Sequence, residues 1–437
     1  MSEIIKNVKK TINAWALFDW ANSAYALVIS TAIFPTFFIE NTDKIVQIGN
    51  FSFTNSSLWT FAVTISYVII AMITPILSGM ADYSGKRMYF LKIFTIIGSL
   101  SCIALYFFNI VPLWVGTSAF ILATIGFSGG IVFYNSYLPL IVTEDRYDRV
   151  SAKGFAAGYI GSVILLLFIL WMVLRPNTFN IPGETPEAQI NAASSIGFIL
   201  VGLWWIVFGF ISFRNLPKDK KLFSDENLWT KGFQEIKSVY GQLKYQPDLK
   251  RFLWSFFFYS AGVQTIIYVA TVFAKLILNF EQGEMIAIVL VLQLVGMVGA
   301  YLFAFISDRI GNKNSLTIMI IIWIFICLVA YITTGKALFY VLAGFVGMVM
   351  GGIQSLSRST YSKMLNEKEE DVTSYFSFYD VLYKSSIVAG TLAYGLVDNL
   401  TGNLRYSVLA LGAFFLIGLY LLRTTNFKKA METSIPD

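Results

Sequence analysis

The sequence has no histidine, only two cysteines and few charged residues. Charged residues make up 13% of its 437 residues, against about 25% in a typical soluble domain. Without histidine, Ser-His-Asp and Cys-His nucleophilic sites are excluded, and so are most zinc sites. No P-loop sequence or other cofactor motif is present, which argues against ATP-driven transport. We therefore expect neither an enzyme nor a bound cofactor or metal.

Apolar residues dominate instead. They account for 56% of the chain, and the mean hydropathy is +0.66. A membrane span needs about 20 apolar residues, and the sequence contains twelve such runs. The predicted spans are 15–39, 57–81, 88–110, 113–142, 150–174, 192–213, 251–278, 284–307, 314–334, 337–364, 372–397 and 403–423.

The distribution of Lys and Arg predicts the topology. Of 32 such residues, 26 fall at the termini or beside the connections that follow even-numbered spans, and four fall in the other connections. Basic residues concentrate on the cytoplasmic side of membrane proteins, so both termini are predicted to be cytoplasmic. The net charge of +6 is spread over short loops, which is not the pattern of a nucleic-acid-binding protein.

The chain divides into two similar halves. Residues 1–213 and 251–437 are each predicted to form a six-helix bundle, joined by a polar linker at 214–250. Within the linker, the apolar spacing from Leu228 to Leu243 predicts an amphipathic helix at the membrane interface. Two short segments recur at similar spacing: Asp82–Arg87 matches Asp308–Lys313, and Gly129-Gly130-Ile131 matches Gly351-Gly352-Ile353. Two segments that recur at nearly the same offset indicate tandem repeats.

The first of these repeated segments has an Asp-x-x-Gly-x-basic pattern after spans two and eight. This pattern resembles the loop motif of the major facilitator superfamily. Glycine permits a sharp turn, and the aspartate can pair with a cation or with a helix N-terminus. A pairing of this kind would hold one conformation and break in the other. The predicted gating residues are Asp82, Gly85, Lys86, Arg87, Asp308, Arg309 and Gly311.

Polar residues inside the spans predict a substrate cavity. Asp19 and Asn22 share one face of span one, and Asn135 lies in span four. Because a charged group within a span is costly, it is a functional candidate by default. The alternative, that Asp19 only pairs with a basic loop residue, stays open.

Spans ten and eleven supply the other candidates. Asp380 and Lys384 are four residues apart, so they can neutralise one another. Lys384 is a candidate to receive an anionic substrate group, or the pair opens and closes with protonation; a static pair is the alternative. Gln354 and Arg358 lie one turn apart, either as cavity residues or as interhelical contacts. Arg358 lies at a depth comparable to that of Asp380, so the two could pair.

Several segments resemble one particular family. Asn13-Ala14-Trp15 through Phe34-Pro35, the Gly351–Ser359 segment and Phe376–Asp380 are similar to the "unknown major facilitator" family, which is related to the autophagy-linked vacuolar effluxers of fungi. The resemblance covers essentially the whole chain. It implies the twelve-span facilitator fold and suggests amino-acid efflux, and the chain's size suits a bacterial inner-membrane member.

The sequence thus predicts an all-α membrane protein of twelve transmembrane helices in two pseudo-symmetric bundles. Its predicted function is secondary active transport of a small polar solute, with an amino acid favoured, by alternating access. The predicted cavity is lined by spans 1, 4, 5, 7, 10 and 11. Buried carboxylates suggest protons as a coupling partner, beside the solute and the lipid bilayer. A sugar or organic-anion transporter and a non-transporting sensor remain alternatives.

Overall fold

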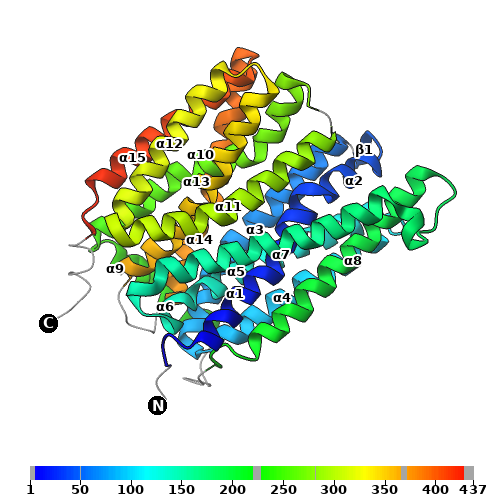
Figure 1. The fold of residues 1–437 in the computed structure, drawn as a ribbon. Coiled ribbons are helices and arrows are strands. Elements are labelled where there is room, and N and C mark those ends of the chain that lie inside the picture. The colour runs from blue at the N-terminus through cyan, green and yellow to red at the C-terminus, as the bar shows by residue number, and fades with distance from the viewer. Residues whose placement is uncertain (1–4, 50, 220–227, 281, 366–371, 428–437) are drawn as a thin grey trace.

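The structure is a computed structural model that describes residues 5–49, 51–219, 228–280, 282–365 and 372–427. The described chain is almost entirely helical (Figure 1). The N-terminal half consists of α1 (Lys9–Ala24), η1 (Tyr25–Ala32), α2 (Phe34–Glu40), β1 (Ile45–Ile48), β2 (Phe51–Thr54), α3 (Asn55–Ser84), α4 (Arg87–Ala104), η2 (Leu105–Phe107), α5 (Leu113–Ser136), α6 (Leu138–Ile141), η3 (Glu144–Arg146), α7 (Tyr147–Leu174), η4 (Pro176–Phe179) and α8 (Pro186–Phe213).

A separate helix and six long helices complete the fold. The separate helix, α9, spans Leu228–Leu243, which are the bounds that the apolar spacing of the linker predicted. The C-terminal half consists of α10 (Pro247–Leu278), α11 (Gln282–Ile310), α12 (Asn312–Ile332), α13 (Lys336–Met364), α14 (Val372–Thr401) and α15 (Leu404–Thr424).

Twelve spans are present in the described ranges, as predicted. Ten helical segments are long and apolar enough to cross a membrane, and α10 and α14, of 32 and 30 residues, run beside them. The first span is not one regular helix, because α1 continues into a π-helical stretch, η1, and then into α2. A further difference is the antiparallel hairpin β1–β2, which pairs Ile45 with Thr54 where the sequence predicted only a connection.

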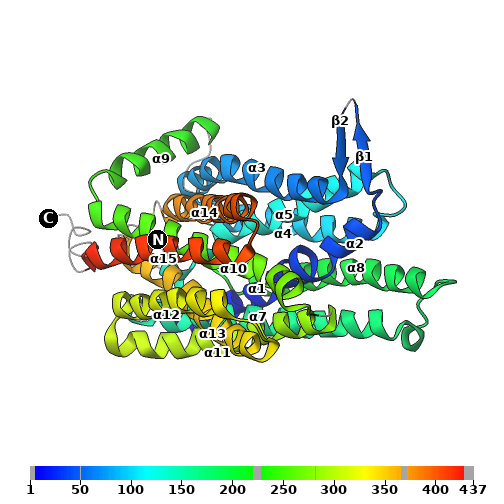
Figure 2. The ribbon, with the colours of Figure 1, turned by 90° about the horizontal axis from the view of Figure 1, so that it is seen from above.

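The two six-helix halves lie side by side and meet along two seams. At one seam α3 packs against α14, and at the other α7 packs against α11 and α13. Figure 2 shows α9 on the outer side of α3 and α14. Within the C-terminal half, the close approach of α11 and α13 needs glycine: a side chain at Gly351 of α13 would collide with the backbone of Gly296 in α11.

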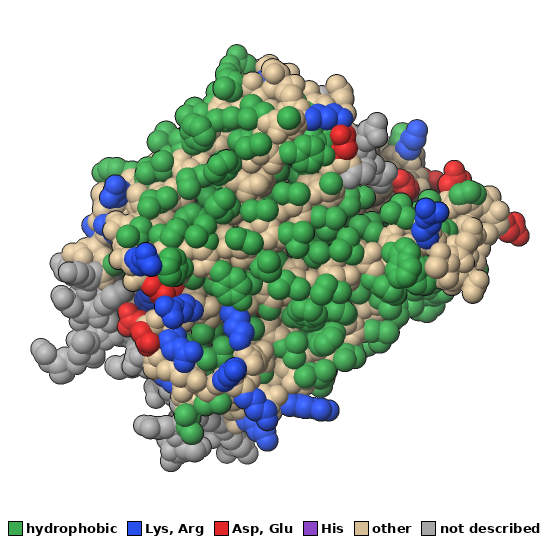
Figure 3. All heavy atoms as spheres, in the orientation of Figure 1, with side chains coloured by type: hydrophobic (Ala, Val, Ile, Leu, Met, Phe, Trp, Pro, Cys, Tyr) green, Lys and Arg blue, Asp and Glu red, His purple; other side chains and the backbone are tan. Residues whose placement is uncertain are grey.

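The two ends of the bundle differ in charge. On the face shown in Figure 3, hydrophobic side chains cover the middle, and Lys and Arg gather at one end. We call it the basic end. It contains the starts of α1 and α10, the end of α15 and the turns at residues 82–87 and 308–313. The opposite end carries the β1–β2 hairpin and is called the hairpin end.

Candidate functional site: a polar cavity between the halves

A cavity of about 280 Å³ lies between the two halves. It is lined mainly by α1 with η1, α5, α7, α10, α13 and α14, which are the six spans predicted from the sequence; α3 and α11 each add one residue. All seven predicted cavity residues line it: Asp19, Asn22, Asn135, Gln354, Arg358, Asp380 and Lys384. The structure therefore brings them together, while their role in binding stays a prediction.

Arg358 crosses from the C-terminal half into a pocket of the N-terminal half. Its Nε donates to Ser151 Oγ at 3.0 Å, Nη1 to Asn135 Oδ1 at 3.1 Å and Nη2 to the Ser151 carbonyl at 2.8 Å. Nη1 lies 3.6 Å from Asp19 Oδ2. The predicted pairing of Arg358 with Asp380 is therefore wrong, because the Arg358 guanidinium is already bound by groups of α1, α5 and α7.

Aromatic rings complete the surroundings of the Arg358 guanidinium. Its carbon lies 4.3 Å from the ring centroid of Phe155, 4.7 Å from that of Trp15 and 5.5 Å from that of Tyr134. The guanidinium is a planar, weakly hydrated cation. It can therefore lie against the faces of aromatic rings and at the same time donate hydrogen bonds in its own plane. The side chain is only 4% exposed, so the pocket replaces most of its water.

Among the described residues, Asp19 is paired within the spans and not with a loop cation. Besides its contact with Arg358, Asp19 Oδ2 accepts from Tyr134 Oη at 3.0 Å, and Oδ1 accepts from Ser23 Oγ at 3.3 Å. The alternative of a basic loop partner is therefore replaced by a partner from α13. One turn further along, Asn22 is 1% exposed, and its Oδ1 has no hydrogen-bond partner among the described residues. A buried acceptor of this kind is available to a solute in the cavity.

Asp380 and Lys384 form a second ion pair in the wall of the cavity. Both lie on α14 and both are buried. The Lys384 ammonium also lies 3.5 Å from the Ser128 carbonyl of α5. Nearby, Gln354 Oε1 accepts from Tyr159 Oη at 2.9 Å. The cavity thus holds two cations and two carboxylates, with zero formal net charge.

At the basic end, the first gating motif closes the α3–α14 seam. Asp82 accepts from the backbone N–H groups of Thr373 and Ser374, at 3.3 and 2.7 Å. These groups begin α14, where the helix dipole favours a carboxylate. Arg87 Nη2 lies 3.0 Å from Asp82, and its Nε donates to Thr373 Oγ1 at 2.7 Å. Gly85 has φ +68°, which permits the turn into α4, and Lys86 is the residue that precedes α4.

The second gating motif is built differently. In the described contacts its Asp308 accepts no backbone N–H group of a helix start; it pairs instead with the exposed side chain of Arg149, in the first turn of α7, at 2.7 Å. Arg309 lies over the ring of Phe305 on its own helix, 4.3 Å from the centroid. Gly311 has φ +79° and permits the turn into α12. The sequence repeat therefore does not produce a repeated contact.

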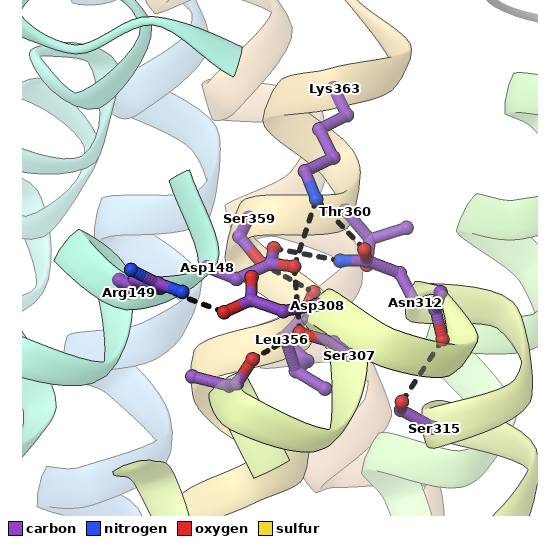
Figure 4. A network of polar contacts seen from close by, with 12 residues as sticks. Asp148, Arg149, Ser307, Asp308, Asn312, Ser315, Leu356, Ser359, Thr360 and Lys363 are labelled. Carbon is purple, nitrogen blue, oxygen red and sulfur yellow. Dashed lines mark hydrogen bonds and ion pairs between the residues drawn. The ribbon is translucent and has the colours of Figure 1, made fainter. Parts of the chain in front are cut away.

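Asp148 of α7 instead closes the second seam (Figure 4). Its Oδ1 accepts from Asn312 Nδ2, and its Oδ2 accepts from Ser307 Oγ and Lys363 Nζ, each at 2.8 Å. Lys363 also donates to Asn312 Oδ1 at 2.8 Å. One carboxylate of the N-terminal half thus holds three groups of the C-terminal half, on α11, α12 and α13.

A family profile described as "Vacuole effluxer Atg22 like" matches residues 7–434. The chain belongs to this family. It is 29% identical over 419 residues to the uncharacterized MFS-type transporter YxiO of Bacillus subtilis, which covers 96% of this chain and 95% of that protein. It is 26% identical over 410 residues to autophagy-related protein 22 of Kluyveromyces lactis, which covers 84% of this chain and 77% of that protein.

Solved structures agree with this Atg22-like assignment at the level of the fold. A crystal structure of the major facilitator transporter FucP in its outward conformation aligns with a TM-score of 0.72 at 11% identity, over 96% of this chain and 100% of that one. The proton:xylose symporter XylE gives 0.68 at 14% identity, over 95% and 94%. The chain is thus a multi-pass major facilitator transporter related to the Atg22 effluxers, and its predicted fold class is confirmed.

Reasoning from the sequence missed several residues of this Atg22-like transporter. Asp148 and Asn312 lie near span ends, where charged and amide residues are common, so nothing in their local sequence set them apart. Ser151 was missed because a serine in a glycine-rich span predicts packing. Lys363 gave the one usable signal, since it follows Arg358 by five residues near the end of a span.

Proposed function

We propose that this Atg22-like protein transports a small zwitterionic solute, an amino acid, by alternating access. The observation that carries the proposal is the charge arrangement of the cavity. Asp19 with Arg358 and Asp380 with Lys384 supply two ion pairs to the cavity wall, each with one carboxylate and one cation. A zwitterion offers one partner of each sign and adds no net charge to a buried site, where an unpaired charge is costly.

The size and lining of the cavity support the same solute class. A volume of about 280 Å³ lies just below the range of about 300–1,000 Å³ that is usual for small-molecule sites, which suits a small solute. Tyrosine, phenylalanine and amide side chains make up much of the remaining wall. They suit an amino acid whose charged groups lie among polar partners while its side chain contacts aromatic rings.

Within this proposal, the two ion pairs have different parts. Lys384 receives the solute carboxylate when a proton neutralises Asp380, and Asp19 receives the ammonium group. Arg358 is already held by Ser151 and Asn135, so it positions Asp19. Proton coupling then follows. Asp380 loses its ion pair with Lys384 when the solute binds, and a bound proton neutralises the Asp380 carboxylate in place of that cation.

The proposal also assigns the moving parts and the orientation. The bundles of residues 1–213 and 251–437, joined by 214–250, rock about the cavity, with the basic end and both termini in the cytoplasm of a bacterial cell. The excess of Lys and Arg at that end supports this orientation. The contacts of Asp82 and Asp148 hold the basic end closed in the present arrangement.

Uptake into proteoliposomes tests the solute class. Radiolabelled amino acids, neutral sugars and organic acids are compared under an imposed pH gradient. We expect uptake of at least one amino acid, and loss of that uptake in Lys384→Gln. The matched control is Ser118→Ala, because the Ser118 hydroxyl is exposed on α5 and bonds only to the Trp114 carbonyl in the described contacts.

The coupling carboxylate is tested separately. If Asp380 carries the coupled proton, Asp380→Asn abolishes the acceleration of uptake by a pH gradient. If Asp19 carries it, Asp19→Asn does so instead, and unchanged pH dependence in that variant rules Asp19 out as the proton site. Unchanged pH dependence in both variants would contradict proton coupling through this cavity.

A neutral sugar is the second candidate solute. The amides lining the cavity, Asn22, Asn135, Gln264, Gln293 and Gln354, are groups that hydrogen-bond sugar hydroxyls, and the tyrosine rings of its wall suit a sugar ring. Thermal-shift measurements on purified protein separate the classes, because a sugar that stabilises the protein while amino acids do not would favour this alternative. Stabilisation without uptake would favour a sensor.

A further inference from the structure

The helix α9 has two different faces. Gly232, Val239 and Leu243 are buried. Trp229, Phe233 and Tyr240 are 59 to 61% exposed, and their spacing of i, i+4 and i+11 places them in one stripe. The exposed Lys237 and Lys244 each follow a residue of this stripe by four positions. An aromatic stripe bordered by lysines is the pattern of a helix at a membrane surface.

The position of α9 points to lipid as its partner. On α3, exposed Phe61, Ile65, Val68 and Met72 form an apolar stripe toward the hairpin end. The same stripe continues through Ile76 and Gly79 toward the basic end, and there the backbone of α9 at Gly232 covers it. The outer face of α9 therefore continues the lipid-facing surface of α3.

α9 also touches both halves of the transporter. Its first part packs on α3 so closely that a side chain at Gly79 or Gly232 would collide with the backbone of the other helix. Its last part contacts α14, where Tyr375 Oη donates to Gln242 Oε1 at 2.9 Å and the rings of Tyr240 and Phe378 stack with centroids 6.4 Å apart. Figures 1 and 2 both show α9 beside the start of α14.

This crossing lies beside the contact that closes the first seam. Tyr375 directly follows Ser374, whose N–H group donates to Asp82 of α3 at 2.7 Å. Opening the basic end must separate α3 from the start of α14. It must therefore also break the contacts of α9 with one of these two helices.

We propose that α9 is a lipid-anchored brace. Its stripe of Trp229, Phe233 and Tyr240 inserts into the leaflet at the basic end, while Lys237 and Lys244 bind anionic lipid headgroups. The bound helix holds α3 and α14 together, so anionic lipid stabilises the arrangement closed at the basic end. Each lysine near an anionic surface changes binding by about fivefold, which is enough to shift a conformational equilibrium.

Distance measurements between spin labels test this proposal without any transport assay, so the result does not depend on the proposed solute. Labels are placed at exposed Asp145 of η3 and Asn314 of α12, which lie in different halves at the basic end and outside α9. The buried Cys102 and Cys327 are replaced by alanine. Nanodiscs of phosphatidylcholine alone are compared with nanodiscs containing phosphatidylglycerol, and we expect about twofold more of the long-distance population in phosphatidylcholine alone.

Two variants make the test specific. Lys237→Gln/Lys244→Gln is expected to show the larger open population in both bilayers, while the matched control Lys9→Gln/Lys10→Gln, with the same charge change at exposed positions outside α9, keeps the lipid dependence. Gly232→Val forces α9 off α3 and should open the basic end even with phosphatidylglycerol. Equal distance distributions in the two bilayers, or lipid dependence that survives the Lys237/Lys244 change, would overturn the proposal.

Discussion

At the residue scale, Arg358 is the most constrained side chain of the cavity. Three N–H donors reach Ser151 and Asn135, and the same group lies 3.6 Å from Asp19. A point charge on a flexible stem cannot reproduce three bonds in one plane. Because every one of these partners belongs to the N-terminal half, Arg358 also joins the two halves.

Arg358→Gln is expected to lower thermal stability strongly. It leaves Asp19 buried without its cation, and breaking a buried pair costs about 3–5 kcal/mol. Arg358→Lys should recover part of the loss, since it keeps the charge but not the fork of donors. Thermal unfolding in detergent measures the effect. Adding Asp19→Asn to Arg358→Gln should cost less than the sum of the single changes, and additive losses would mean that the two side chains do not interact.

Asn22→Ala, unlike Arg358→Gln, should change the affinity for the solute more than the thermal stability. Its Oδ1 bonds to no described residue, so its removal breaks no contact at that atom, and we expect a small change in thermal stability. If the acceptor serves the solute, the apparent affinity should fall about fivefold to tenfold, the loss of one hydrogen bond. Uptake kinetics in proteoliposomes measure this affinity, with Ser118→Ala as the control. Unchanged affinity would remove Asn22 from the binding site.

At the element scale, two similar motifs meet different helices. Asp82 lies at the N-terminus of α14, where it accepts two backbone N–H groups and faces the positive end of the helix dipole. Asp308 meets a side chain, Arg149, that is 69% exposed. Exposed pairs contribute about 0–1 kcal/mol. At the second seam, the contacts that hold the two halves together are made by the buried Asp148 and not by Asp308.

Asp82→Asn and Asp308→Asn are therefore a matched pair with unequal outcomes. Asp82→Asn should open the basic end several-fold more often, because α14 loses its charged cap, whereas Asp308→Asn should change the population little. Labels at Asp145 and Asn314 report both. Equal effects of the two substitutions would show that the sequence repeat, and not the contacts seen here, governs the gate.

At the scale of the whole molecule, both seams are closed at the basic end while the cavity lies between the halves. A rocking motion must separate α7 from α11 and α13 and also α3 from α14. Disulfide formation across one seam should therefore stop the cycle, since the halves move as bodies.

Asp148→Cys/Ser307→Cys tests this motion, because the two native side chains are 2.8 Å apart across the second seam. Oxidation should abolish uptake, and subsequent reduction should restore uptake to the level that the double variant shows before oxidation. The native cysteines are buried and free, so they do not compete. Uptake that persists in the cross-linked protein would contradict rocking at this seam.

The twelve spans, their two-half arrangement and the bounds of α9 could be predicted from the amino-acid sequence, because hydrophobic periodicity and length are local properties that the bilayer selects. The sequence also placed all seven cavity candidates at one cavity, since uncompensated polar groups cannot face lipid. The partners of these polar groups could not be predicted, because they depend on how the helices pack in three dimensions. Arg358 pairs with Asp19 and not with Asp380, and Asp148 takes the role that the repeat assigned to Asp308. These contacts join residues more than 150 positions apart, and small differences in helix packing determine which donors meet which acceptors.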